Sequence, residues 1–375
     1  MRVLVVNAGS SSVKLTLLDG DDSVLASRQL DAPRARVDPS ELDDALGSAL
    51  AAADAVGHRI VHGGERYRRA MRIDAEVRSE LEALCDLAPL HQPKSLAALD
   101  AVSAALPALP AVACFDTAFH STLTAAARTY ALPAAWRERW GLRRYGFHGL
   151  SHAWVARRAA QMLACEKNGP RLVSCHLGAG ASLCAIRDGR SVDTTMGFTP
   201  LEGLVMATRS GNVDPGLLTW LLERCEVSIP ELNDALEHGS GLLGLSGSAD
   251  MKEVTRAAAA GAAAAQLALD VYVHRLRAAI AAMAASMNGL DALAFTGGVG
   301  ERSAEVRSRT AAGLRFLDVA LEEPRNELAT SDCDISAPGA RVRTLVITAR
   351  EDLEIADQTR AALAEPVPAP APPAP

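Results

Sequence analysis

An apolar strand that ends in a turn of small residues occurs three times in the sequence, and this repetition constrains the fold most. The first stretch, residues 2–18, contains "VVNAGSSSVK". The second, residues 171–186, reads "RLVSCHLGAGASLCAI" and is followed by Asp188, Gly189 and a third strand. In the third, residues 290–307, a strand leads into a Gly-rich turn and a helix. Placing Gly9 on Gly178 aligns the first two stretches as strand, glycine turn and strand, which indicates a duplicated fold.

Helical and strand patterns alternate between these stretches. Apolar periodicity predicts helices over residues 39–53, 75–87, 93–105, 153–164, 215–224 and 254–287. Short β-like runs cover residues 55–62, 111–115 and 342–348. Strands that alternate with helices predict an α/β protein with mixed sheets.

Composition excludes several classes of function. The chain of 375 residues is long enough for two domains, and its net charge of −7 argues against a nucleic-acid partner. The Ala-rich stretch 257–290 is interrupted by Asp270, His274, Arg275 and Arg277, so it predicts a helix in water and no membrane span. No secretory signal is visible, and seven scattered cysteines without a CxxC pair indicate a reduced, cytoplasmic protein. The Pro/Ala-rich tail, residues 365–375, is expected to be disordered.

The turn after the first strand suits a phosphate group. Gly9 and the serines at 10–12 offer backbone N–H groups and small hydroxyl side chains. The Walker pattern is absent and the segment continues as a strand, so this would be a hairpin whose turn holds phosphate. Lys14 lies on the alternating face of the second strand. An ordinary Ser-rich hairpin turn is the alternative.

Charged residues stand at other predicted turns. Asp116 directly follows an apolar strand, where α/β sheets place site carboxylates. Arg59 lies near the end of a strand in "GHRIVHGGE", and Arg209 lies in the turn "MATRSGNVDPG". A guanidinium holds a carboxylate or a phosphoryl group through paired donors. The structural alternatives are ion pairs of Arg59 with Glu65 and of Arg209 with Asp214.

Histidines raise two further questions. His148 and His152 in "RRYGFHGLSH" are four residues apart and could bind zinc, but no nearby Cys or carboxylate completes such a site. His58, His62 and His176 are expected to be hydrogen-bonded turn or core residues.

Taken together, these segments resemble the acetate kinase family of the acetate and sugar kinase, Hsp70 and actin superfamily. The motifs are "NAGSSSVK", "GHRIVHGGE", "LAPLHQP", "FDTAFH", "YGFHGLSH", "HLGAGAS", "TTMGFTPLEGLVMATRSGNVDPG", "FTGGVGERS" and "AREDLEIA", in the family's order and spanning residues 1 to about 357. The resemblance implies two ribonuclease H-like βββαβαβα domains with an interdomain active-site cleft. The implied domains are residues 1–120 with 354–364, in which the last helix returns to the first domain, and residues 121–353.

The resemblance also implies an activity, the reversible Mg²⁺-dependent transfer of the γ-phosphoryl group of ATP to acetate, which gives acetyl phosphate and ADP. Mn²⁺ is an alternative metal. Arg59 and Arg209 match the family's active-site arginines, Asp116 its essential aspartate, and His148 the histidine that donates to the transferring group. Asn7 and Glu351 match the family residues near the metal, and Glu351 is the stronger candidate ligand.

The remaining site residues are also carried over from the family. Val61, Leu90, Phe147 and Pro200 match the pocket for the acyl methyl group. The matched nucleotide and phosphate positions are Ser10, Ser12, Lys14, His176, Gly178, Gly180, Asp250, Met251, Lys252, Gly298, Gly300 and Arg302, and His91 matches a further active-site histidine.

The chain departs from the family pattern on the nucleotide side. Ala179 and Arg302 stand where Asn is usual, Lys252 where Arg is usual, and Arg350 where Asn or Asp is common. These changes raise the hypothesis of altered nucleotide affinity, or of another donor such as pyrophosphate.

Two other functions are alternatives to the predicted acetate kinase activity. One is an acyl kinase that prefers propionate or butyrate, although propionate kinases tend to have a smaller residue where Val61 stands. Another is a non-catalytic ATP-binding paralogue, which predicts the loss of Arg59, Asp116, His148 or Arg209, and all four are present. The family further implies a homodimer.

Overall fold

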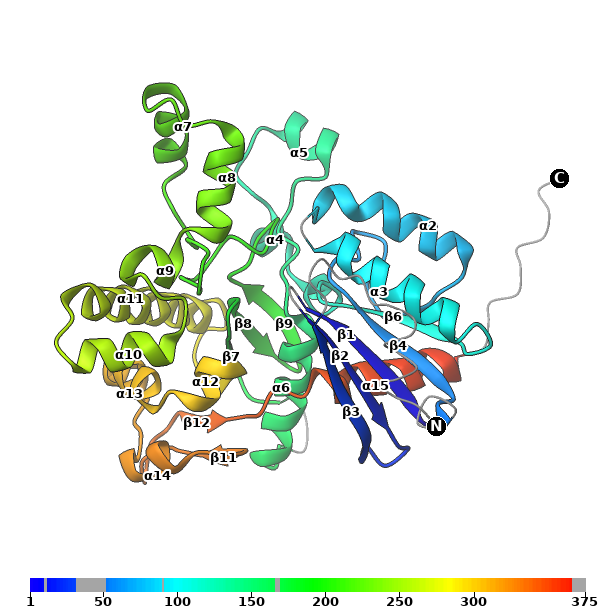
Figure 1. The fold of residues 1–375 in the computed structure, drawn as a ribbon. Helices are drawn as coiled ribbons and strands as arrows, with labels where there is room; N and C mark the ends of the chain where they lie inside the picture. Colours follow the sequence, from blue (N-terminus) through cyan, green and yellow to red (C-terminus); the bar gives the residue numbers. More distant parts are fainter. Residues whose placement is uncertain (10–11, 32–51, 90, 166–168, 366–375) are drawn as a thin grey trace. The chain divides into compact units, whose positions relative to one another are not determined.

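The computed structural model describes residues 1–9, 12–31, 52–89, 91–165 and 169–365. The chain divides into two compact units, which are described separately (Figure 1). Unit 1 comprises Met1–Ala118 with Arg350–Pro375, and unit 2 comprises Phe119–Ala349. The predicted helix at 39–53 and the Pro/Ala tail lie largely outside the described residues.

Unit 1 is built on a six-stranded mixed sheet in the order β3-β2-β1-β4-β6-β5. β1 pairs antiparallel with β2 and parallel with β4, which in turn is parallel to β6. The elements are β1(Val3–Ala8), β2(Ser12–Leu18), β3(Val24–Asp31), β4(Ala55–Ile60), β5(Met71–Arg72), α2(Ala75–Ala83), η3(Leu84–Leu87), α3(Gln92–Ala105), β6(Ala111–Phe115) and α15(Glu351–Ala364).

Helices cover both faces of this sheet (Figure 1). Successive side chains of a strand point to opposite faces, so a buried strand packs against helices on both sides. Val56 of β4 packs with Ala98 and Val102 of α3 in one apolar core. On the other face Gly57 leaves room for α15: a Cβ there would lie 2.4 Å from Thr359 Oγ1 and 2.8 Å from Ile355. The last helix therefore returns to the sheet of the first unit.

Unit 2 repeats the same topology. Its sheet has the order β11-β12-β10-β7-β8-β9, and the antiparallel β7, β8 and β9 correspond to β1, β2 and β3. Its elements are η4(Ala118–Thr122), which starts at the unit boundary, α4(Ala125–Arg128), α5(Ala134–Trp140), α6(Gly149–Met162), β7(Leu172–Leu177), β8(Ala181–Arg187), β9(Arg190–Thr194), α7(Pro215–Arg224), α8(Ile229–His238), α9(Gly241–Ser246), α10(Met251–Ala259), α11(Ala263–Ser286), β10(Ala292–Thr296), α12(Gly297–Arg302), α13(Ala304–Ala312), η5(Arg315–Leu317), α14(Glu323–Leu328), β11(Cys333–Asp334) and β12(Arg343–Val346).

The repetition confirms the predicted duplicated α/β fold. The two hairpin turns have the same length: one joins Ala8 to Ser12 and the other joins Leu177 to Ala181. Gly9 N donates to Ser12 O over 2.8 Å, and Gly178 N donates to Gly180 O over 3.0 Å. The alignment of Gly9 with Gly178 thus pairs turns that are equivalent in the fold.

Two predicted helices differ in extent from the structure. The pattern over 254–287 predicted a single helix, but the structure has α10 and α11, separated at Gly261. Gly261 has φ +88°, a left-handed conformation that glycine adopts readily and that ends α10. The predicted helix at 153–164 begins earlier, at Gly149, directly after His148.

Candidate active site

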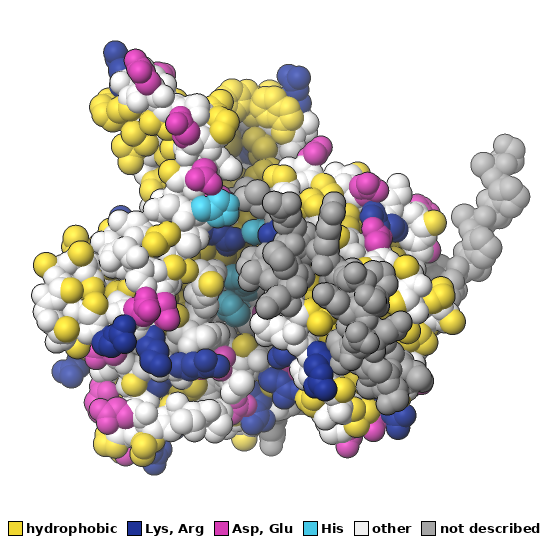
Figure 2. Space-filling model, in the orientation of Figure 1, with side chains coloured by type: hydrophobic (Ala, Val, Ile, Leu, Met, Phe, Trp, Pro, Cys, Tyr) yellow, Lys and Arg dark blue, Asp and Glu magenta, His cyan; other side chains and the backbone are white. Residues whose placement is uncertain are grey.

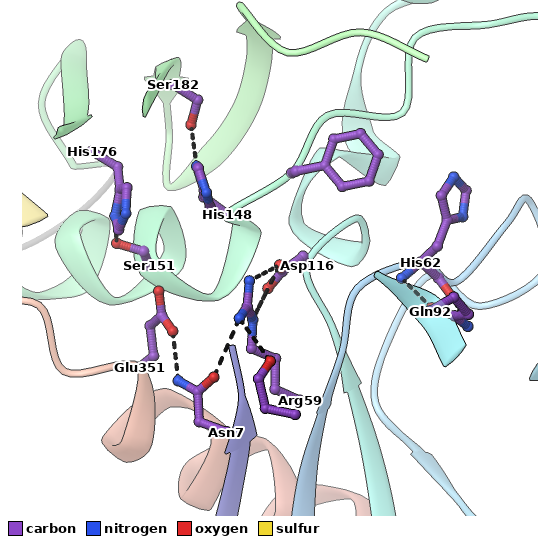
Figure 3. A network of polar contacts seen from close by, with 12 residues as sticks. Asn7, Arg59, His62, Gln92, Asp116, His148, Ser151, His176, Ser182 and Glu351 are labelled. Carbon is purple, nitrogen blue, oxygen red and sulfur yellow. Dashed lines mark hydrogen bonds and ion pairs between the residues drawn. The ribbon is translucent and has the colours of Figure 1, made fainter. Parts of the chain in front are cut away.

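Unit 1 gathers Asn7, Arg59, Asp116 and Glu351 into one polar network (Figure 3). Arg59 Nη2 donates to Asp116 Oδ2 over 2.7 Å, and Arg59 Nε lies 3.2 Å from both carboxylate oxygens of Asp116. Arg59 Nη1 donates to Asn7 Oδ1 over 3.3 Å, and Asn7 Nδ2 donates to Glu351 Oε2 over 2.8 Å. One guanidinium therefore ties together an amide and a carboxylate from separate strands.

The parallel strands explain this convergence. Asn7 lies near the carboxyl end of β1, Arg59 near that of β4, and Asp116 just after β6. Since β1, β4 and β6 are parallel, these ends lie at one edge of the sheet, where α/β proteins place their ligands. Glu351 is the first residue of α15, so its carboxylate also meets the positive end of that helix dipole.

Burial makes the charges of this network depend on one another. The Asp116 side chain is 2% exposed, and this burial raises the pKa of Asp116, while the Arg59 guanidinium opposes the rise. Burial alone would lower the pKa of Arg59, but the carboxylates of Asp116 and Glu351 raise it above its ordinary value. Arg59 therefore stays charged, and the predicted alternative partner, Glu65, is not the residue that holds it.

Unit 2 gathers a second set around the β7–β8 hairpin turn. A Cβ on Gly180 would lie 3.4 Å from His148 Nε2 and 3.6 Å from Arg209 Nη1. A Cβ on Gly178 would lie 3.5 Å from His176 Nε2. The rings of His148 and His176 stack with their centroids 4.4 Å apart. Two histidines and an arginine therefore border the backbone of this turn.

Arg209 is held by a glutamate that the sequence analysis did not identify. Arg209 Nε lies 2.8 Å from Glu237 Oε2, and the Glu237 carboxylate is buried. Thr208 Oγ1 also donates to the Glu237 carbonyl oxygen over 2.8 Å. Asp214, the partner considered from sequence, instead caps α7 by accepting from Gly216 N. No sequence signal marks Glu237, because only the packing of α8 brings it to Arg209.

Serines hold the histidines of unit 2. His148 Nδ1 lies 2.9 Å from Ser182 Oγ, and Ser151 Oγ lies 2.8 Å from His176 Nδ1 (Figure 3). His152 bonds to Ser182 and to Ser174. Within the described parts of the chain no group of three or more His, Cys, Asp or Glu side chains could hold a metal ion.

His148 also has an unusual backbone. It precedes α6 with φ +57°, in the left-handed region that non-glycine residues rarely occupy. Residues held in such conformations cluster at functional sites. The local geometry therefore supports singling out His148 among the histidines.

The other residues expected at the site lie in varied surroundings. Lys14 is exposed on β2, where its backbone pairs with Asn7. Val61 and Phe147 are buried, Pro200 is half-buried, and Ser10 and Leu90 lie outside the described residues. The nucleotide-side positions are exposed at Asp250, Lys252, Gly298 and Arg302, half-buried at Gly178 and Gly180, and buried at Met251 and Gly300.

Two findings on unit 1 were not anticipated. Gln92, fully buried, accepts from His62 N and donates to His62 O, which fixes the backbone beside Val61. His58, expected to be hydrogen-bonded, has no hydrogen-bond partner for either ring nitrogen among the described residues. Burial lowers the pKa of His58 to about 4, so the ring is neutral near pH 7.

Comparison with known proteins gives the family. Residues 37–357 match the acetokinase family. The chain belongs to that family. Among its relatives, the acetate kinase of Nostoc punctiforme is 44% identical over 397 residues, covering 95% of this chain and 98% of that protein.

Solved acetokinase structures share the fold. A propionate kinase from Francisella tularensis superposes with a TM-score of 0.89 at 34% identity, covering 96% of this chain and 99% of the other. The Porphyromonas gingivalis acetate kinase superposes with a TM-score of 0.88 at 35% identity, with the same coverage. The two-unit architecture is therefore that of acetokinases, which are phosphotransferases. No helix among the described residues of this acetokinase is long and apolar enough to cross a membrane.

Proposed function

We propose that this acetokinase is an acetate kinase, which transfers the γ-phosphoryl group of ATP reversibly to acetate and yields acetyl phosphate and ADP. The observation that carries the proposal is the buried Arg59–Asp116 pair at the carboxyl edge of the unit 1 sheet, linked through Asn7 to Glu351. The family match over most of the chain supports the same reaction.

In unit 1, Arg59 would hold the anions. Its positive charge would reduce the repulsion between the acetate carboxylate and the phosphoryl group, while Asp116 and Asn7 hold the guanidinium in place. Asp116 accepts from Arg59 over 2.7 Å and so keeps the guanidinium in one orientation. Holding two anions within reach of each other is the main obstacle in this reaction, and positioning lowers it.

In unit 2, Arg209 and His148 would donate to the phosphoryl oxygens during transfer. Both border Gly180, within 3.6 Å of the place of its missing Cβ. Donors fixed before the reaction stabilise the charge of the transferring group without reorganisation. His176 and the backbone of the turn at Gly178 would serve the phosphates of the nucleotide.

A general base is not required. The carboxylate of acetate is already ionised at pH 7 and attacks directly. The most deeply buried thiols, Cys114, Cys175 and Cys184, are poor nucleophiles, because burial raises the pKa of Cys114 to about 12 and those of the other two further. Direct in-line transfer therefore fits the available side chains.

The residues present fit a magnesium ion. Mg²⁺ in phosphoryl-transfer sites takes one or two carboxylates, waters and substrate phosphates, so it needs no cage of protein ligands. Glu351 provides a carboxylate at the start of α15, and Asn7 Nδ2 donates to that carboxylate and so orients it. We assign Glu351 as the ligand and Asn7 as its support. The ion would neutralise charge on the phosphates.

The acyl side is expected to favour acetate, because propionate kinases tend to have a smaller residue where Val61 stands. Val61, Phe147 and Pro200 would contact the methyl group, with Leu90 as the further matched position. The Francisella tularensis relative is a propionate kinase, and one methylene is worth about 1–3 kcal/mol of discrimination. Propionate is therefore expected to be a slower substrate.

The residues on the nucleotide side raise an alternative to ATP as the phosphoryl donor. The nucleotide would contact α12 at Gly298, Gly300 and Arg302. It would also contact the start of α10 at Asp250, Met251 and Lys252. Arg302, Lys252 and Ala179 are exposed. ATP is the proposed donor, and pyrophosphate is the alternative that the altered residues raise.

A homodimer is also proposed. In α7 and at the start of α8, large apolar side chains are exposed: Leu217 by 45%, Trp220 by 54% and Ile229 by 73% (Figure 2). Burial of such a surface against a second copy removes apolar area from water. Sedimentation should give the mass of a dimer, and Trp220→Glu should give that of a monomer. All seven cysteines are free, which supports the proposed cytoplasmic location.

The test of the function is acyl phosphate formation by the purified chain. ATP, GTP and pyrophosphate are each combined with acetate, propionate and butyrate in the presence of Mg²⁺, and hydroxylamine traps the product. The proposal predicts the highest kcat/KM for ATP with acetate. A preference for propionate, or activity with pyrophosphate in place of ATP, would select the corresponding alternative, and no product with any pair would refute the function.

A further inference from the structure

A single buried hydroxyl joins two histidines of unit 2. Ser182 Oγ lies 2.9 Å from His148 Nδ1 and 2.8 Å from His152 Nε2. The other ring nitrogen of His152, Nδ1, lies 2.9 Å from Ser174 Oγ. His152, Ser174 and Ser182 are all fully buried. The four side chains therefore form one chain of hydrogen bonds, Ser174–His152–Ser182–His148, which solvent does not reach at its inner end.

The number of protons restricts how this chain can be arranged. A serine hydroxyl has one proton to donate, and a neutral imidazole carries one N–H. Burial, with His120 and His176 nearby, lowers the pKa of His152 well below its ordinary value, so the ring is neutral near pH 7. If His152 donates from Nε2 to Ser182, the Ser182 hydroxyl donates to His148 Nδ1, and neutral His148 must carry its proton on Nε2.

The other arrangements do not leave a neutral His148 with a proton on Nε2. If His152 donates from Nδ1 to Ser174, Ser182 donates to His152, and His148 must then donate from Nδ1. His148 would then have a proton on Nε2 only as a cation. If both imidazoles donate to Ser182, its own proton has no acceptor among the described residues. Only the first arrangement gives a neutral His148 with a donor at Nε2.

The charged surroundings of His148 disfavour its cationic form. Arg209 Nη1 and His148 Nε2 border the same point above Gly180, at 3.6 and 3.4 Å. From β7, His176 stacks on the His148 ring at 4.4 Å, and His152 lies on the same helix, α6. The carboxylate of Glu237 is already paired with Arg209. A second positive charge beside the guanidinium would be repelled.

We propose that Ser182 and His152 are positioning residues that hold His148 in the tautomer protonated at Nε2. This inference rests on the proposed function in one respect: the Nε2–H of His148 would donate to an oxygen of the transferring phosphoryl group. Ser182 and His152 touch no reacting atom and act through His148. This role would account for the burial of His152, Ser174 and Ser182. Their polar groups add no apolar contact to the core, but each is hydrogen-bonded within the chain.

The test compares two buried serines that each bond to a histidine. Ser182→Ala removes the shared hydroxyl. Ser191→Ala is the matched control, since Ser191 Oγ lies 2.8 Å from His120 Nδ1 and is also fully buried, but no hydrogen bond links it to His148. Ser182→Ala should lower kcat by roughly 10- to 100-fold, the usual cost of losing an outer-shell partner, with KM for acetate and ATP changed by less than about threefold. Ser191→Ala should keep kcat within about twofold.

Nitrogen NMR of the protein labelled with ¹⁵N-histidine reports the tautomer of His148. A purely structural role of Ser182 would leave this tautomer unchanged. The His148 signals of the unaltered protein should show a protonated Nε2 and an unprotonated Nδ1, and Ser182→Ala should give a mixture of tautomers. Where Ser182→Ala fails to fold, Ser182→Cys retains most of the volume with a weak donor, and it should shift kcat and tautomer in the same direction.

The outcomes separate this proposal from the proposed function. An unaltered kcat and an unaltered His148 tautomer in a folded Ser182 variant would overturn the positioning role. His148 protonated at Nδ1 in the unaltered protein would overturn it as well. If the unaltered protein makes no acyl phosphate, the proposed function fails, and the tautomer measurement still decides the inference.

Discussion

Arg209 depends on one buried carboxylate for its orientation. Glu237 accepts from Arg209 Nε over 2.8 Å, and Glu237→Gln keeps the shape of the side chain but removes its charge. A charge-assisted hydrogen bond contributes about 1.5–3 kcal/mol, so we expect kcat of acetyl phosphate formation to fall roughly 10- to 100-fold. Steady-state kinetics of the purified variant measure this.

Asp214→Asn is the control for that prediction. Asp214 is the alternative partner of Arg209 that the sequence suggested, but it caps α7, and Asn is an equally good N-cap. Its kinetics should therefore match those of the unaltered protein. A larger loss in Asp214→Asn than in Glu237→Gln would contradict the assigned partner.

The candidate site shows which residues a sequence can identify. Arg59 and Asp116 could be singled out because each lies at a strand end, where the ends of parallel strands meet at one edge, whereas Asn7 was assigned through the family resemblance. Their partners could not be chosen from spacing alone. Glu65 is near Arg59 in sequence, but the structure pairs Arg59 with Asp116 across the sheet. Glu237, Ser182 and Gln92 reach their partners only through tertiary packing.

At the level of single elements, α12 provides a test of the nucleotide side. Gly298 is the second residue of α12, is exposed, and no atom of the described residues lies within 4 Å of the place of its missing Cβ. Alanine is more favourable than glycine in a helix by up to about 1 kcal/mol, so Gly298→Ala should leave the melting temperature unchanged or raise it. If the nucleotide lies against Gly298, KM for ATP should rise severalfold.

Gly216→Ala is the matched variant, because Gly216 is the exposed second residue of α7. It should leave KM for ATP unchanged. An unaltered KM in Gly298→Ala would place the nucleotide elsewhere. Kinetics with ATP as the varied substrate, together with thermal unfolding, separate the two outcomes.

Element boundaries show the limit of periodicity. The range of α7, Pro215–Arg224, and that of β6, Ala111–Phe115, agree with the prediction, because Pro215 and the apolar run of β6 mark them locally. The break between α10 and α11 was missed, since an Ala-rich segment has similar apolar content on every face and hides a change of direction. Gly261 alone was the available signal.

At the scale of the whole molecule, buried histidines should make stability depend on pH. The pKa values of His58, His62 and His120 are lowered by burial to about 4, below the unfolded value of 6.5. Between these pH values the unfolded chain binds protons that the folded chain does not. The free energy of unfolding should therefore fall as pH decreases from 6.5 toward 4, by at most about 1.4 kcal/mol per pH unit for each histidine, and show no histidine contribution above pH 7.

His58→Leu tests this prediction, since the His58 ring has no hydrogen bond to lose within the described residues. Urea unfolding followed by circular dichroism at pH 7.5, 6.5 and 5.5 should show a smaller pH slope in the variant. The same slope in both proteins would mean that His58 titrates normally in the folded chain.

The duplicated architecture was predictable because its signal is local. Each half contains a strand, a three-residue turn of small residues and a second strand, and the sheet orders repeat as β3-β2-β1-β4-β6 and β9-β8-β7-β10-β12. The single buried hydroxyl of Ser182 between His148 and His152 has no such signal. Its partners come from different elements, α6 and β8, so only the folded chain brings them together.

The most direct test of the proposed acetate kinase is acetyl phosphate formation from ATP and acetate by Arg59→Ala. Arg69→Ala is the control, because Arg69 is an exposed arginine of the same unit that pairs with Glu365. Circular dichroism must show that both variants are folded, since Asp116 loses its buried partner in the first. We predict that kcat/KM falls by about 100-fold or more in Arg59→Ala and stays near the unaltered value in Arg69→Ala. A folded Arg59→Ala variant that retains most of its activity would contradict the site and the reaction assigned to it.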